Sequence, residues 1–159
     1  MPRTHLQEIP VKKVWTDFAY ARDIPAGTIG SGFRYGQELA IINAGGGFFA
    51  LSNKLPPTGQ PATLAKVEKL EGQAVVVEPV SGSCFSLKTG KPVGPWCPSL
   101  VGRFILSKLV SPTNVPVYPV RKSGDKIQCL IDVNLKAKFE AQYWRGVLDA
   151  QGKVDGGYY

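Results

Sequence analysis

The stretch Glu38-Leu-Ala-Ile-Ile-Asn43, followed by Gly45-Gly46-Gly47 and Phe48-Phe-Ala-Leu-Ser52, consists of two apolar runs separated by a run of glycines. Short apolar runs on either side of a flexible turn are typical of a β-hairpin. A glycine-rich turn can also cradle phosphate, but a P-loop needs a following helix and a Gly-Lys-Ser/Thr ending, and neither is present here. The stretch therefore predicts a hairpin.

More short strands and turns are predicted on both sides of this hairpin. A strand is expected from Val11 to Tyr20, before a turn at Asp23-Ile-Pro-Ala-Gly27 whose glycine can take a positive φ. Gly30-Ser-Gly32 is predicted to be another hairpin turn. Two further hairpins are expected: Gln73–Glu78 with Cys84–Leu87, and Val115–Val120 with Ile127–Val133 around the turn Lys122-Ser-Gly-Asp125.

The composition agrees with a small β-rich domain that is poor in chemical groups. The chain has 159 residues, with 18 Gly, 13 Pro and 43% hydrophobic residues, which favours one all-β domain over a helical bundle. It contains one His, His5, close to the N-terminus, where a catalytic role is rare. No Ser/His/Asp set can be assembled and no element carries paired carboxylates, so hydrolase chemistry is improbable.

The chain offers no segment that we expect to span a membrane, and its cysteines leave several states open. No run approaches the roughly 18 apolar residues that a spanning helix needs, so we expect any membrane association to be peripheral. The first 13 residues lack the apolar core of a secretory signal. Cys84, Cys97 and Cys129 are expected to be reduced, buried thiols. A bridge between Cys84 and Cys97, or a redox-sensing thiol, is the alternative.

The net charge of +7 is spread along the chain in ones and twos. Scattered basic residues usually form a solvated surface, whereas a nucleic-acid barrel interleaves them with exposed aromatic residues on one sheet face. Nucleic-acid binding is therefore not expected. The charge is compatible with an acidic protein face or an anionic membrane surface.

The C-terminal part differs from the rest, because Leu135–Ala150 contains no proline and is rich in helix formers. Leu135, Phe139, Tyr143 and Val147 recur every four residues and predict one side of a helix, with Asn134 as its N-cap. This apolar side either packs on the β core or docks to another protein. Since Tyr, Trp and Arg dominate interface cores, the docking candidates are Tyr143, Trp144, Arg145, Tyr158 and Tyr159.

Two stretches carry a family resemblance: Phe49-Ala-Leu-Ser-Asn-Lys-Leu55-Pro56-Pro57-Thr58-Gly59 and Glu78-Pro79-Val80-Ser81-Gly82-Ser83-Cys84-Phe85-Ser86-Leu87-Lys88-Thr89-Gly90. They resemble the first and second cluster-binding boxes of Rieske iron-sulfur domains. The family's proline, glycine, phenylalanine and threonine positions are matched by Pro56, Gly59, Pro79, Gly82, Phe85, Thr89 and Gly90. The resemblance covers roughly residues 15 to 133 and implies a Rieske-like fold of small stacked antiparallel sheets or a barrel, followed by a C-terminal α-helix and tail.

The ligands of the Rieske cluster are missing from these boxes. A Rieske [2Fe-2S] centre is held by two Cys on one iron and two His on the other. The four positions read Leu55 and Pro57 in the first box, and Glu78 and Ser81 in the second. Leucine and proline have no donor atom, and hard oxygens suit an iron-sulfide core poorly. We therefore expect no metal and no cofactor, and expect the loops to pack together through Leu55, Pro56, Pro57 and Pro79.

The resemblance also implies a function and a division of the chain. Cluster-less domains of this kind resemble accessory proteins of algal plastids, which implies a non-catalytic subunit with a structural or assembly role. It would dock on a thylakoid photosynthetic complex in the chloroplast, a photosystem or its light-harvesting antenna, peripheral to the membrane. The expected parts are an N-terminal arm (1–14), the β domain (15–133) and a helix with a tail (134–159).

Two alternatives to the docking role remain open. The first is a redox protein, either a thiol sensor or an electron-transfer or oxygenase-associated subunit that uses Cys84, Cys97 or Cys129. Such a sensor needs an exposed thiol with a lowered pKa. The second is an enzyme subunit whose catalytic partner lies on another chain.

Overall fold

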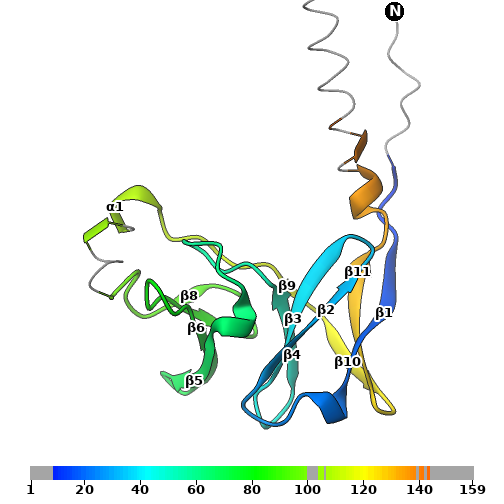
Figure 1. The fold of residues 1–159 in the computed structure, drawn as a ribbon, viewed down its shortest axis with the longest axis horizontal. Helices are drawn as coiled ribbons and strands as arrows, with labels where there is room; N and C mark the ends of the chain where they lie inside the picture. The colour runs from blue at the N-terminus through cyan, green and yellow to red at the C-terminus, as the bar shows by residue number, and fades with distance from the viewer. Residues whose placement is uncertain (1–8, 100–103, 106, 139, 142, 144–159) are drawn as a thin grey trace, which may run out of the picture.

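A computed structural model describes residues 9–99, 104, 105, 107–138, 140, 141 and 143 of the chain. These residues form three small antiparallel sheets, which confirms the all-β expectation. The first sheet has the order β1-β11-β10, the second β2-β3-β4-β9, and the third β5-β6-β7-β8. In Figure 1 the second sheet lies between the other two.

The elements follow one another in this order: β1 (Lys13–Tyr20), η1 (Ala21–Asp23), β2 (Ile29–Arg34), β3 (Gln37–Asn43), β4 (Phe48–Ser52), η2 (Ala62–Leu64), β5 (Lys66–Leu70), β6 (Gln73–Val77), β7 (Cys84–Ser86), β8 (Pro92–Val93), α1 (Ser107–Leu109), β9 (Val117–Tyr118), β10 (Val120–Ser123) and β11 (Lys126–Asp132). We call β1, β10 and β11 the sheet lobe, and β5–β8 with their connecting loops the loop lobe. Helical backbone reappears in the described residues from 135 to 143.

The central sheet is buried on both faces, because successive residues of β3 enter different cores. Leu39 and Ile41 pack with residues of the sheet lobe, whereas Ala40 and Ile42 pack with residues of the loop lobe. All four side chains are at most 1% exposed. Neighbouring side chains of a strand point to opposite faces. The uninterrupted apolar run of the predicted hairpin is therefore a strand sandwiched between two lobes, and β3 pairs with β4 as predicted.

Most of the predicted hairpins are confirmed, but the Gly30-Ser-Gly32 turn is wrong. These residues lie within strand β2 and pair with β3. A Cβ on Gly32 would lie 2.4 Å from the carbonyl oxygen of Phe18, and one on Gly30 would lie 2.9 Å from Cδ1 of Ile24. The glycines therefore allow β1 and the segment after it to approach β2 closely. The local sequence alone does not distinguish glycines with this role from glycines in a turn.

The third predicted hairpin is present with a different first strand. Val117 and Tyr118 pair with β4, and only after Pro119 does the chain join β11 as β10. The turn lies at Gly124 and Asp125, where Gly124 has φ +60°. The Val115–Val120 segment thus crosses from the central sheet to the sheet lobe. Its last residue, Val120, is the first residue of β10.

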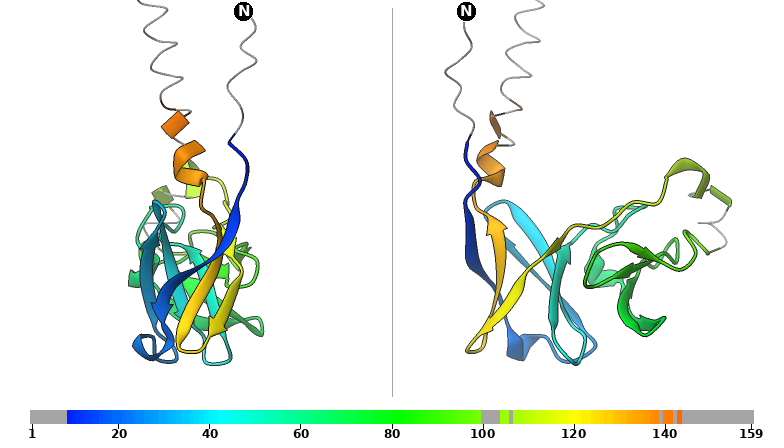
Figure 2. Two further views of the ribbon diagram at one scale, coloured as in Figure 1. Left: turned by 90° about the vertical axis from the view of Figure 1, so that its right-hand side faces the viewer. Right: turned by 180° about the vertical axis from the view of Figure 1, so that it is seen from behind.

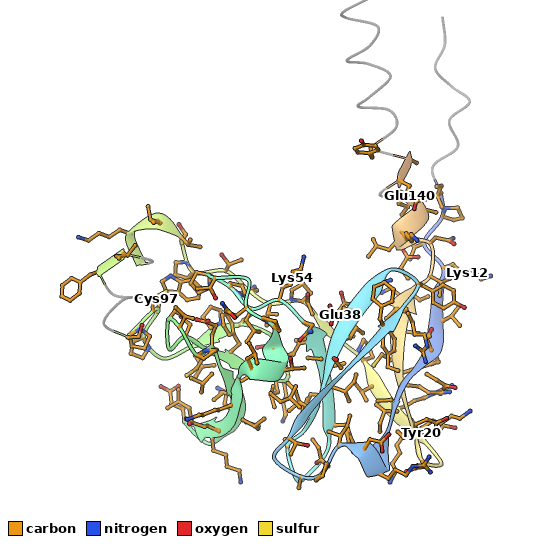
Figure 3. The ribbon with its side chains drawn as sticks, in the orientation of Figure 1. Lys12, Tyr20, Glu38, Lys54, Cys97 and Glu140 are labelled. Atoms are coloured by element: carbon orange, nitrogen blue, oxygen red, sulfur yellow. The ribbon has the colours of Figure 1, made fainter. Side chains whose placement is uncertain are left out.

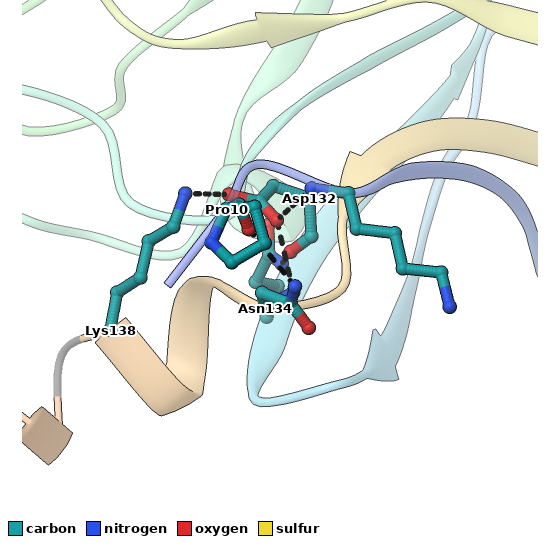
Figure 4. A network of polar contacts seen from close by, with 6 residues as sticks. Pro10, Asp132, Asn134 and Lys138 are labelled. Carbon is teal, nitrogen blue, oxygen red and sulfur yellow. Dashed lines mark hydrogen bonds and ion pairs between the residues drawn. The ribbon is translucent and has the colours of Figure 1, made fainter. Parts of the chain in front are cut away.

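Asp132 joins the segment before β1 to the segment after β11 by hydrogen bonds (Figure 4). Its Oδ1 accepts hydrogen bonds from the backbone N–H of Lys12 at 3.1 Å and of Asn134 at 2.9 Å, and its Oδ2 contacts Lys138 Nζ at 2.8 Å. Asn134 holds the predicted N-cap position directly before the helical segment, but its side-chain Nδ2 donates to the carbonyl of Pro10. Its backbone carbonyl accepts the first helical hydrogen bond, from Lys138.

The described members of the predicted apolar helix side do not bury against the sheets. Leu135 is 44% exposed and Tyr143 is 62% exposed. Figure 2 shows the helix leaving the upper end of the sheet lobe, beside the N-terminal segment. Among the described residues, no helix has the length and apolar character needed to cross a membrane.

Candidate functional site

Three loops meet in the loop lobe where the two boxes of the sequence come together. We call residues 55–60, 78–83 and 95–99 the three-loop cluster. The first loop follows β4, the second joins β6 to β7, and the third follows β8. In Figure 3, Cys97 of the third loop lies on the far side of the molecule from Glu140 of the C-terminal helix.

The first loop is anchored by a residue at a ligand position of the resembled pattern. Leu55 is fully buried and belongs to the core shared by the central sheet and the loop lobe. Its N–H donates to the carbonyl of Gln60 at 2.9 Å, and its own carbonyl accepts from the N–H of Gly59 at 2.8 Å. These bonds close the loop around the half-buried Pro57. Leu55 thus contributes core packing where the pattern has a cysteine.

The second loop closes around the carboxylate of Glu78, which is fully buried. Oε1 accepts hydrogen bonds from Thr58 Oγ1 at 2.8 Å and from the N–H of Val80 at 3.1 Å. Oε2 accepts from the N–H of Ser81 at 2.6 Å and from the Ser81 hydroxyl by a short contact. An ionised carboxylate has about four acceptor sites. The four donors therefore use its full acceptor capacity.

Glu78 and Ser81 also fix the backbone of the second loop. The N–H of Glu78 donates to the carbonyl of Ser83 at 2.8 Å, and the N–H of Gly82 donates to the carbonyl of Glu78 at 2.9 Å. Gly82 takes φ +75°, a conformation that strains other residues. The N–H of Ser83 donates to the Ser81 hydroxyl at 3.2 Å. The loop is thus a tight turn with the carboxylate folded inside it.

The third loop covers the second through hydrogen bonds to its backbone and to Ser83. The N–H of Cys97 donates to Ser83 Oγ at 2.9 Å. The N–H and hydroxyl of Ser99 donate to the carbonyls of Ser81 and Val80, at 2.9 and 2.7 Å. Trp96 packs edge-on against the buried Phe85, with ring centroids 6.0 Å apart. The three loops therefore form one hydrogen-bonded unit resting on the core.

The contact between the first and second loops differs from the one that the sequence predicts. We expected apolar packing through Leu55, Pro56, Pro57 and Pro79. Pro79 is exposed, and the hydrogen bond between the loops joins Thr58 to Glu78. Glu78 was recognised as the residue at a ligand position, but its role as an acceptor for two loops was missed. Its donors include Thr58, which lies 20 residues earlier in the chain, so local spacing carries no signal for it.

The residues of the three-loop cluster do not fit a Rieske [2Fe-2S] cluster. Leu55 and Pro57 have no donor atoms, and the Glu78 and Ser81 oxygens are buried and hydrogen-bonded to each other. Residues 14–130 contain no histidine, although the cluster requires two. Among the described residues, no group of three or more His, Cys, Asp or Glu side chains could hold a metal ion.

The three cysteines are free thiols without the features of a redox sensor. Cys97 and Cys129 are buried and Cys84 is half-buried. Burial, and then the nearby charge of Glu68, raise the pKa of the Cys84 thiol. Burial raises the pKa of Cys129 to about 12. A raised pKa leaves little of the reactive thiolate at neutral pH.

The residues predicted to bind a partner are described only in part. Tyr143 is exposed and lies on the C-terminal helical segment. Trp144, Arg145, Tyr158 and Tyr159 lie outside the described residues. Tyr143, the member of this set that the structure describes, belongs to the helical segment and not to the three-loop cluster.

Comparisons with known proteins agree with this arrangement of sheets and loops. A family model described as a Rieske-like [2Fe-2S] domain matches residues 14–130. A search of curated proteins by sequence finds no match.

Similar solved structures cover most of the chain. One, described as the small subunit of an NADH-dependent nitrite reductase from Mycobacterium tuberculosis, has a TM-score of 0.59 and 23% identity, covering 75% of this chain and 96% of that one. The Escherichia coli protein NirD has a TM-score of 0.57 and 19% identity, covering 75% and 97%. The ferredoxin of carbazole 1,9a-dioxygenase from Nocardioides aromaticivorans has a TM-score of 0.57 and 16% identity, covering 74% and 98%. At such identities the likeness concerns the fold alone.

Proposed function

The chain belongs to the family of Rieske-like [2Fe-2S] domains, and we propose that it is a member that acts without a cluster, as a docking subunit rather than an electron carrier. The observation that carries this proposal is the Glu78 carboxylate. It occupies the interior of the second loop, and its acceptor sites are taken by Thr58, Val80 and Ser81. A scaffold whose loops are closed by its own side chains still offers rigid surfaces to a partner.

The partner in this proposal is a thylakoid photosynthetic complex, a photosystem or its light-harvesting antenna. The chain would be a non-catalytic accessory subunit with a structural or assembly role, held at the chloroplast thylakoid without spanning it. The support for this placement is the resemblance to cluster-less accessory proteins of algal plastids. The net charge of +7 is compatible with it. The C-terminal helix and tail are the proposed docking segment, with Tyr143, Trp144 and Arg145 at its centre.

Metal analysis tests the cluster-less part of the proposal. Iron and acid-labile sulfide are measured in the full chain purified under anaerobic conditions. The expected result is far less than one cluster per chain. Stoichiometric iron and sulfide would overturn the proposal and favour electron transfer, the main alternative, which the similarity to the ferredoxin of carbazole 1,9a-dioxygenase supports.

Co-purification followed by mass spectrometry tests the docking part. Tyr143, Trp144 and Arg145 are replaced together by alanine in the full chain, which is then recovered from solubilised thylakoids. We expect the wild type to bring down the complex and this variant to lose it. The matched control replaces Lys136 and Glu140, an exposed pair of the same helical segment. Equal retention of the complex by both variants would show that the docking segment is assigned wrongly.

A further inference from the structure

The outer face of the sheet lobe carries basic residues without partners. Its strands and the turn between β10 and β11 contain three carboxylates, and each is already paired with a base. Asp17 lies 3.5 Å from Lys126, Asp125 lies 3.3 Å from Arg22, and Asp132 lies 2.8 Å from Lys138. Within the described part of the chain, Lys13 and Arg121 of this face form no ion pair. Their positive charges are therefore not neutralised by an ion pair.

Arg121 is held in place by its neighbours on this face. Its Nε donates to Gln128 Oε1 at 2.7 Å, and Gln128 Nε2 donates to Asp17 Oδ1 at 2.7 Å. The guanidinium lies over the ring of Trp15, 4.4 Å from its centroid. The terminal amino groups of Arg121 make no hydrogen bond among the described residues. The guanidinium is therefore oriented in advance, and its paired donors remain available.

A second guanidinium lies on the other side of β1. Arg34, at the end of β2, lines a shallow hollow together with Trp15, Asp17, Tyr35 and Gln128. Its Nη1 donates to the carbonyl of Phe33 at 2.7 Å, and it has no ion pair in the described ranges. The left view of Figure 2 looks onto this side of the molecule, where β1, β11 and β10 face the viewer. The hollow places a positive charge beside the half-buried Trp15.

We propose that this basic face, defined by Lys13, Trp15, Arg34 and Arg121, docks an acidic surface of a partner protein. Guanidinium groups bind carboxylates through two parallel hydrogen bonds, and a guanidinium that is already oriented loses less freedom on binding. Arg and Trp are also the residues that most often carry interface energy. The inference deepens the proposed docking role, on which it rests, and assigns the partner's chemistry to a surface outside the C-terminal segment.

The face suits a carboxylate-rich protein better than a membrane or a nucleic acid. Trp15 and Leu130, the apolar residues that point outward at the centre of this sheet, are both half-buried, so neither projects for insertion into a bilayer. Arg121 covers a face of the Trp15 ring, which a stacked base would need. The acids already paired with bases would repel a dense array of phosphates.

A peptide titration tests the basic face directly. A fluorescein-labelled Glu-rich peptide is titrated with the full chain at low salt and at about 0.15 M salt, where exposed charges more than about 8 Å apart are largely screened from each other. The test variant carries Lys13→Gln and Arg121→Gln. The control carries Lys88→Gln and Lys91→Gln, two exposed lysines of the loop lobe, and so has the same net charge. At about 1.5- to 5-fold per exposed charge, the test variant should bind about 2- to 25-fold more weakly, and the control nearly as the wild type does.

Further arms separate the basic face from net charge and from other partners. Arg121→Lys keeps the positive charge but loses the planar guanidinium that makes two parallel hydrogen bonds, so this variant should bind the peptide more weakly. Thermal unfolding should show that the variant is still folded. Equal weakening in the test and control variants would overturn the proposal, because net charge alone would explain it. Binding to phosphatidylglycerol vesicles without binding to the peptide would also overturn it. Peptide binding retained by the Tyr143/Trp144/Arg145 variant would support the basic face even if the tail assignment fails.

Discussion

The two lobes on either side of the central sheet are stabilised in different ways. The sheet lobe packs Phe18, Ile127 and Ile131 against Leu39 and Ile41, so apolar side chains fill its interior. The loop lobe has an apolar core of its own around Phe85, but the three-loop cluster beyond it closes around a buried carboxylate. The difference teaches that the same scaffold can be completed by packing in one place and by hydrogen bonds in another. The hydrogen-bonded region contains the two stretches that resemble the cluster-binding boxes of the family.

The largest expected effect comes from adjacent residues of β3 that serve different lobes. Ile41→Ala and Ile42→Ala should each lower the free energy of unfolding by about 2–5 kcal/mol, because each leaves a cavity in a full core. Both side chains are 0% exposed. Amide hydrogen exchange should rise first in β11 for Ile41→Ala and first in β6 and β7 for Ile42→Ala. The same exchange pattern in both variants would show that the cores do not act as separate regions.

Gly32→Ala should damage the contact between β2 and β1. The added Cβ would lie 2.4 Å from the carbonyl oxygen of Phe18, so the strands must separate. Overpacking of this kind costs about 1–3 kcal/mol, and chemical denaturation measures it. Gly46→Ala is the control, because nothing lies within 4 Å of its added Cβ. A loss no larger than that of the control would mean that β2 tolerates a side chain at this position.

Glu78→Gln should loosen the three-loop cluster while the sheet lobe stays intact. The new amide places a donor opposite donors from Thr58 or Ser81, and an unsatisfied buried group costs about 1–3 kcal/mol. Glu38→Gln is the matched control, because Glu38 is exposed and accepts one side-chain hydrogen bond, from Asn53. Denaturation should show a loss only for Glu78→Gln, with faster amide exchange at residues 80–83. Equal stability of the two variants would contradict the role assigned to the carboxylate.

The smallest expected effect is a pH dependence confined to the end of the sheet lobe. The hydrogen bond from Lys138, with further ones from Lys12 and Asn134, holds the pKa of Asp132 below its usual value of 3.8. A carboxylate with a lowered folded-state pKa contributes stability above pH 3.8 and loses it as the pH falls through the folded-state value. Asp132→Asn should remove this part of the acid dependence and speed exchange of the Asn134 amide. If Asp132→Asn left the exchange rate of the Asn134 amide and its dependence on pH unchanged, the stabilising role of Asp132 would be contradicted.

Much of the fold could be predicted because local signals decide its turns and strands. The hairpin around Gly45 follows from two apolar runs and from glycines that accept positive φ; Gly45 has φ +89°. Strand β2 could not be predicted, since Gly30 and Gly32 look like turn residues until β1 is packed beside them. The path of Val117 and Tyr118 to β4 was missed for a similar reason, because Pro119 marks a change of sheet rather than the interior of a strand.

For the candidate site, the sequence determined which donor atoms are available, and the tertiary structure decided how they are arranged. Residues 14–130 contain no histidine, and the positions that the resemblance aligns with cluster ligands are Leu55, Pro57, Glu78 and Ser81. Donor chemistry depends on residue type alone. That Thr58 reaches the Glu78 carboxylate, and that Arg121 reaches Trp15 across β11, follows only from the folded chain. Such contacts join residues far apart in sequence, so they exist only once the sheets have brought the strands together.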